Sequence, residues 1–175
     1  MPAYPSRLIT AGSVACLLAL ACSDDGVGPI VPLISCQPIA GGDFLTRGLY
    51  VDSFPGSRLR EVRIFFSGSV AGDYTISLTV RRNAYDGPLV GADTITINVP
   101  TTASDTVPGS FLFANPVIQA GSIVTFQLGQ VSGPGALFYA TPANPGCPAT
   151  ETEGTTPPLD TFRREGMGLR IFGPR

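Results

Sequence analysis

The sequence predicts an all-β fold, a single antiparallel β-sandwich of jelly-roll type, with a closed barrel as the alternative. Four stretches alternate apolar and polar residues with a period of two, typical of strands with one buried face: residues 61–66, 74–81, 94–99 and 124–128. The 21 Gly and 17 Pro among the 175 residues interrupt the chain often and disfavour long helices. After the N-terminal segment, no stretch of 11 residues has an apolar stripe at helical spacing.

The N-terminal segment predicts a cleaved export signal. Arg7 precedes an apolar run over residues 8–21, which at 14 residues is shorter than the roughly 20 that a spanning helix needs. The run ends in Leu18-Ala19-Leu20-Ala21-Cys22 and here resembles a bacterial lipoprotein, whose box-closing cysteine becomes the lipid-bearing first residue. The resemblance implies a signal over residues 1–21 and lipidation of Cys22. The family usually has Leu where this chain has Ala19, and ordinary signal cleavage after Ala21 stays open.

The lipoprotein resemblance implies a lipid-anchored protein of the bacterial cell envelope, facing the periplasm or the cell surface. Ser23 follows Cys22 directly and differs from the Asp that retains such proteins at the inner membrane, which favours the outer membrane. Residues 22–43 are rich in Gly, Pro and Asp and are expected to form a flexible tether, followed by the sandwich over residues 44–175. From Cys22 onward 10 Arg face 13 acidic residues, a net charge of −3 that does not favour nucleic-acid binding.

Weaker strand signals occur over residues 45–54, 106–113, 136–140 and 167–172. The order of stretches 74–82, 86–90, 94–97, 120–128 and 168–172 resembles small secreted bacterial jelly-roll modules over most of residues 45–173. That resemblance implies adhesion, carbohydrate binding or scaffolding, and the fold does not choose among them.

The cysteines predict one disulfide. Cys16 leaves with the signal, and lipidation of Cys22 leaves Cys36 and Cys147 as an even pair. In an oxidising envelope these two are expected to bridge, with two free thiols as the alternative.

The chain contains no His, Lys or Trp. Without His, a Ser-His-Asp triad and His-based metal sites are excluded, and we predict no catalytic residue, no cofactor and no metal site. A carboxylate pair drawn from Asp52, Glu61 and Asp93 is the enzymatic alternative. Asp73 and Asp86 are interpreted as ordinary turn residues, and a structural calcium held by loops distant in sequence also stays open.

Two features suggest ligand binding. Tyr85 lies in a turn between Asn83 and Asp86, so these three are the candidate ligand contacts, with the loop 142–148 beside them; otherwise Tyr85 covers one end of the sandwich. Arg63 and Arg81 take polar positions on strands expected to be neighbours, which predicts a positive stripe for an acidic partner or an anionic glycan. Pairing with nearby acids such as Glu61 is the alternative.

The sequence therefore predicts a non-enzymatic, lipid-anchored envelope protein that displays a β-sandwich for binding or scaffolding. Its expected partners are the membrane, through the anchor, and another envelope protein or a glycan. One alternative is an accessory structural subunit of a membrane protein complex, and a second is a carbohydrate-binding or carboxylate-based glycan-acting module.

Overall fold

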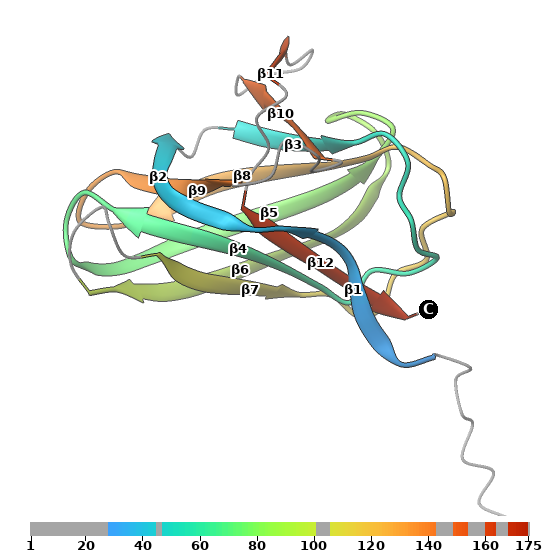
Figure 1. Cartoon of the computed structure of the whole chain (residues 1–175), viewed down its shortest axis with the longest axis horizontal. Coiled ribbons are helices and arrows are strands. Elements are labelled where there is room, and N and C mark those ends of the chain that lie inside the picture. Colours follow the sequence, from blue (N-terminus) through green and yellow to red (C-terminus); the bar gives the residue numbers. More distant parts are fainter. Residues whose placement is uncertain are drawn as a thin grey trace, which may run out of the picture.

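The computed structural model describes residues 28–44, 47–100, 106–142, 149–153, 160–163 and 168–174 (Figure 1). Within these residues every regular element is a β-strand, and the strands form two six-stranded sheets. No helix in this part of the chain is long and apolar enough to cross a membrane. The strands are β1 (Ile30–Cys36), β2 (Pro38–Phe44), β3 (Arg47–Val51), β4 (Glu61–Gly68), β5 (Gly72–Arg82), β6 (Leu89–Val99), β7 (Val107–Leu112), β8 (Val124–Ser132), β9 (Leu137–Pro142), β10 (Ala149–Glu153), β11 (Asp160–Arg163) and β12 (Leu169–Pro174).

The strand pairing is nested, as a jelly roll requires. The hairpin β5–β6 lies inside the pair β4–β7, which lies inside β3–β8, which in turn lies inside β2–β9. Folding this long ladder over itself puts β2, β9, β4 and β7 in one sheet and β3, β8, β5 and β6 in the other. The strands β12 and β1 extend the first sheet, here called sheet A, and β10 and β11 extend the second, sheet B. All pairs are antiparallel, so the predicted fold class is confirmed.

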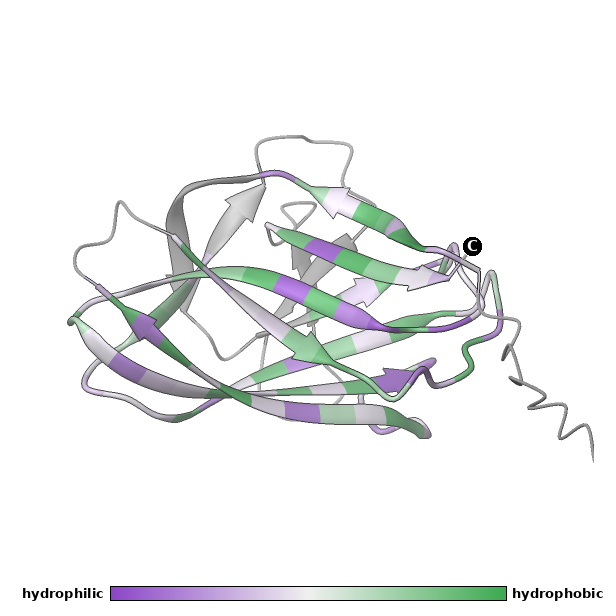
Figure 2. Cartoon of the chain, turned by 90° about the horizontal axis from the view of Figure 1, so that it is seen from below, coloured by the Kyte–Doolittle hydropathy of each residue, from purple (hydrophilic) through white to green (hydrophobic). Residues whose placement is uncertain are grey.

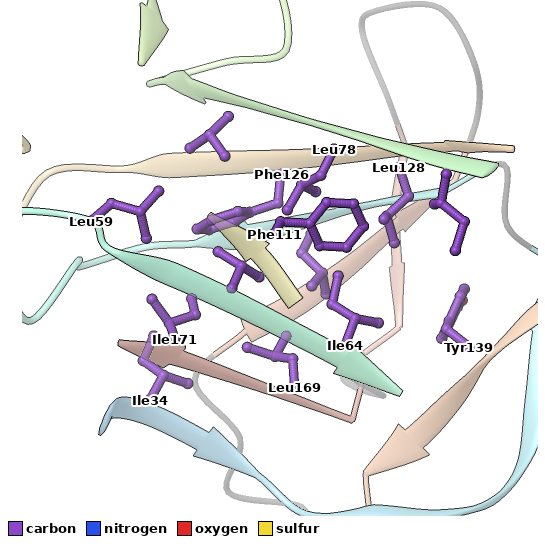
Figure 3. Close-up of a cluster of buried hydrophobic side chains, with 14 of the residues drawn as sticks. Ile34, Leu59, Ile64, Leu78, Phe111, Phe126, Leu128, Tyr139, Leu169 and Ile171 are labelled. Carbon is purple, nitrogen blue, oxygen red and sulfur yellow. The ribbon is translucent and has the colours of Figure 1, made fainter. Parts of the chain in front are cut away.

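The period-two pattern places one apolar row of each strand between the sheets. On β5 the side chains of Tyr74, Ile76, Leu78 and Val80 are fully buried, whereas the alternating Thr and Ser residues face outward. The alternation is visible along the strands in Figure 2. Residues from both sheets meet in one core, shown in part in Figure 3. Within this core the rings of Phe66 and Phe111 pack edge to face, with their centres 6.4 Å apart.

The predicted tether is wrong from residue 30 onward, because β1 and β2 are part of sheet A. β1 pairs with β12 in antiparallel register from Ile30 opposite Pro174 to Cys36 opposite Leu169, and buries Ile34 and Cys36. Pro32 lacks an N–H, yet β1 is an edge strand and its register shifts between Pro32 and Ile34, where a proline is tolerated. The sandwich therefore begins at Ile30, not at residue 44.

The four weaker signals are confirmed as β3, β7, β9 and β12. Besides β1 and β2, the strands β10 and β11 were not predicted. β10 adds to the edge of sheet B beside β3, and β11 pairs with β10.

Candidate binding face on the outer side of sheet A

The predicted ligand site at the β5–β6 turn is not an exposed aromatic platform. Tyr85 is only 9% exposed and has interactions of its own, so its ring is a cover for the end of the sandwich. Asn83 and Asp86 do lie exposed on the turn, as expected. The prediction that Tyr85 contacts a ligand is wrong, because an aromatic platform must offer its ring face to solvent.

The backbone of this turn is held in place by its own hydrogen bonds. Asn83 has a φ of 66°, a left-handed conformation that asparagine tolerates well. The N–H of Gly87 donates to the carbonyl of Ala84 at 2.9 Å, and Arg81 Nη1 donates to the carbonyl of Gly87 at 2.9 Å. A Cβ at Gly87 would lie 1.8 Å from the carbonyl oxygen of Arg82, so this position requires glycine.

The predicted positive stripe of Arg63 and Arg81 is also wrong. Arg63 lies on β4 in sheet A, whereas Arg81 lies on β5 in sheet B. The two strands follow each other in the chain but cross from one sheet to the other, which alternation alone does not reveal. Arg81 instead secures the β5–β6 turn.

The residue that does lie beside Arg63 is Arg170 on β12, directly opposite in the β4–β12 register. The outward-facing residues form a grid across four strands, here called the Arg/Phe face. It consists of Pro32 and Ser35 on β1, Arg170 and Phe172 on β12, Glu61, Arg63 and Phe65 on β4, and Pro108, Ser110 and Leu112 on β7.

Arg63 is held on this face by three neighbours. Its Nη2 and Nε donate to Glu61 Oε1 at 2.7 and 2.9 Å, and Nε also donates to Ser110 Oγ at 3.1 Å. Its Cζ lies 5.2 Å from the centre of the Phe172 ring, diagonally across the strand pair. The alternative of pairing with Glu61 is thereby confirmed, and the Arg63 guanidinium is held in a salt bridge.

Arg170 is less well satisfied. Its Cζ lies 5.9 Å from the Phe65 ring centre, and the approximate two-fold symmetry of the antiparallel β4–β12 pair relates this contact to that of Arg63 with Phe172. Its Nε is buried, and among the described residues no acceptor receives that N–H. Arg63 directly opposite adds like-charge repulsion. The Arg/Phe face therefore carries two arginines against one carboxylate, and Arg170 lacks a partner of opposite charge in the described part.

The three acids of the enzymatic alternative have separate surroundings in the structure. Glu61 accepts both bonds from Arg63. Asp93 Oδ2 accepts the backbone N–H of Leu112 at 2.7 Å and so links the edge of β6 to the edge of β7, while Asp52 is exposed beyond β3. The described residues bring no three His, Cys, Asp or Glu side chains together in a way that suits a metal ion.

The remaining predicted sites lie partly outside the described residues. Cys36 is fully buried and disulfide-bonded. Its expected partner Cys147, the lipidation candidate Cys22 and most of the loop 142–148 fall outside the described part, so the Cys36–Cys147 pairing stays a prediction.

Sequence reasoning missed the aromatic half of the Arg/Phe face. Phe65 interrupts the alternation between Ile64 and Phe66, and Phe172 follows the buried Ile171, so each is an aromatic ring at a position that should be polar. Both are half-buried in the structure. That mismatch is the signal that would have revealed them.

No family model and no curated protein matches the chain. Among solved structures, it is similar to a glycoside hydrolase family 43 arabinoxylan arabinofuranohydrolase from Bacillus subtilis, at 16% identity over 65% of this chain and 26% of the other, with a TM-score of 0.36. It is also similar to the VP2 protein of infectious bursal disease virus, at 14% identity over 95% of this chain and 44% of the other, with a TM-score of 0.29. The chain thus spans less than half the length of these proteins. The assignment as a jelly-roll sandwich rests on the nested strand pairing.

Proposed function

We propose that this chain is a non-enzymatic, lipid-anchored protein of the bacterial cell envelope that binds a partner protein through the Arg/Phe face. The sandwich is the rigid support, and an acidic segment of another envelope protein is the partner. This reading includes a role as an accessory structural subunit docked on a membrane complex.

The observation that carries the proposal is the pairing of Arg170 with Phe65 beside Arg63 with Phe172. Arginine and aromatic residues are enriched at the energetic centres of protein interfaces. A carboxylate placed between the two guanidinium groups would relieve their repulsion and give Arg170 the oppositely charged partner that it lacks among the described residues. The half-exposed rings offer apolar area around that ionic contact.

A protein partner is favoured over a glycan for two reasons. The Arg/Phe face lies on the surface of four neighbouring strands, which suits a broad contact between two proteins. The glycan hypothesis used Tyr85 as a platform or a stripe of Arg63 and Arg81, but the Tyr85 ring is buried and the two arginines lie in different sheets.

The anchor half of the proposal rests on the sequence that ends in Cys22. Two or more acyl chains on one cysteine would hold the protein stably at a membrane, since each buried methylene contributes about 0.8 kcal/mol. We expect a palmitate analogue to label the wild-type protein in cells and to leave Cys22→Ala unlabelled. Label that survives this substitution, or no label on the wild type, contradicts the anchor.

Affinity purification from solubilised envelopes tests the binding half. The wild type should enrich a defined partner, and Arg170→Ser and Phe65→Ser should each lose at least 80–90% of it, in line with the roughly 2 kcal/mol of an interface hot spot. Thr94→Ala, an exposed substitution on β6 in sheet B, is the control and should retain it. A thermal melt of each variant establishes that it is folded. Equal recovery by wild type and Arg170→Ser contradicts the proposed face.

A further inference from the structure

The end of the sandwich at which the described chain begins gathers arginines and exposed apolar side chains. β1 starts there at Ile30, β12 finishes there opposite it, and the connections β3–β4, β5–β6 and β7–β8 all lie at this end (Figure 1). We call it the N-terminal end. The turns β4–β5 and β8–β9 lie at the opposite end, one strand length away.

Hydrogen bonds and strand pairing join these residues into one band. Arg82 Nη2 on the β5 end donates to the carbonyl of Val117 at 2.9 Å. Val117 forms an isolated bridge with Arg58, whose Nη1 donates to the carbonyl of Asn115 at 3.0 Å.

The band continues from Arg58 to the ends of β12 and β1. The carbonyl of Arg58 lies beside Gly173, and Pro174 pairs with Ile30. Leu89 extends the band on the other side through its register with Arg81.

The band is amphipathic. Ile30, Leu89 and Val117 are 46%, 59% and 54% exposed, three of the six large apolar side chains exposed in the described residues. Arg60 and Arg82 are exposed and Arg58 is half-buried. With Arg81 this end has four arginines, against three described acids, Asp52, Asp86 and Glu61, the last of which is paired with Arg63 on β4.

The length of chain before Ile30 determines how far this end can stand from an anchor at Cys22. Seven residues, 23–29, separate the two positions. Fully extended, this segment reaches at most about 28 Å, and a flexible chain of that length averages about 16 Å. The tether expected from the sequence, which ran to residue 43, would have more than doubled the fully extended reach. A lipidated Cys22 therefore keeps the N-terminal end within reach of the membrane interface.

We propose that the N-terminal end docks on the bilayer surface itself, an inference that rests on the proposed lipid anchor. Arg60 and Arg82 would meet lipid phosphates, and Leu89, Val117 and Ile30 would enter the interfacial layer, as the apolar faces of interfacial proteins do. The strands then run away from the membrane. The Arg/Phe face stands beside the bilayer, free to meet a neighbouring envelope protein.

The absence of tryptophan allows a direct test with a single introduced fluorophore. Leu89→Trp places the reporter in the band, and Val131→Trp places it at the far end of β8, where Val131 is 62% exposed. Each full-length chain is produced in a bacterial host, purified in detergent and reconstituted into phosphatidylglycerol–phosphatidylethanolamine vesicles with brominated acyl chains. Bromine quenches tryptophan only when the ring reaches the acyl region.

The docked orientation predicts at least twofold stronger quenching of Leu89→Trp than of Val131→Trp. Adding Arg60→Ser should reduce the quenching of Leu89→Trp. Replacing the anionic lipids by neutral phosphatidylcholine should also reduce it. Vesicle flotation is measured on the same samples. Flotation with equal quenching of the two reporters overturns the docking and leaves the anchor standing, whereas failure to float overturns the anchor and the docking with it.

Discussion

Replacing Ile34 by alanine tests whether residues 30–36 are a structural strand or part of a tether. Ile34 is 4% exposed, lies opposite Ile171 on β12 and belongs to the shared core. Truncating a buried isoleucine to alanine typically costs about 2 to 5 kcal/mol, because apolar contacts are lost and a cavity remains. For a chain of this size, about 3 kcal/mol corresponds to a fall in Tm of roughly 6 to 12 °C.

The same strand supplies the control. Ile30 is 46% exposed, so Ile30→Ala should change the free energy of unfolding by less than about 0.5 kcal/mol. Urea titration and thermal melts of the purified wild type and the two variants provide the comparison. If Ile34→Ala lowers the free energy of unfolding as little as Ile30→Ala, residues 30–36 place no side chain in the core. The assignment of β1 to the sandwich is then refuted.

Three further substitutions test individual contacts. Gly87→Ala should destabilise by about 2 kcal/mol or more in urea titration, because its Cβ would meet the Arg82 carbonyl at 1.8 Å. Gly121→Ala, with φ of +78° and no atom nearer to its Cβ than Ser53 Oγ at 4.0 Å, should cost only about 1 kcal/mol, and the reverse order would be evidence against the close approach. Tyr74→Phe removes the hydroxyl bond to the Val70 carbonyl at 2.6 Å and should lower the free energy of unfolding by about 1 kcal/mol, so an unchanged urea midpoint would contradict the bond. If Cys36 pairs with Cys147, Cys147→Ser should destabilise by roughly 2 to 5 kcal/mol, and a wild type whose intact mass does not rise by two hydrogens on reduction refutes the bridge.

The alternating stretches were predictable because their pattern is local. The apolar residues of 74–80 are the buried row of β5, and the weaker stretches 106–113 and 167–172 contain β7 and β12. The N-terminal strands were missed because Gly and Pro dominate residues 38–42 and Pro32 interrupts β1, a composition that also suits a linker. What makes β1 a strand is β12, more than 130 residues later.

The candidate face depended on information that no local pattern contains. Alternation says which side chains point away from the core, but not which of the two sheets a strand joins, so Arg63 was paired with Arg81 instead of Arg170. The diagonal contacts of Arg63 with Phe172 and of Arg170 with Phe65 depend on the β4–β12 register. Tyr85 was misjudged because a turn position predicts exposure, while the end of the sandwich needs a cover.

Site-specific photo-crosslinking in intact cells tests the Arg/Phe face most directly. A photoreactive amino acid replaces Leu112, an exposed residue on the β7 side of the face, or Thr96, an exposed residue on the outer side of sheet B. The account predicts a discrete adduct with one envelope protein from position 112, little or none from position 96, and loss of the adduct in the Arg170→Ser background. Adducts from position 96 alone, or an adduct at 112 that is unchanged by Arg170→Ser, would contradict it.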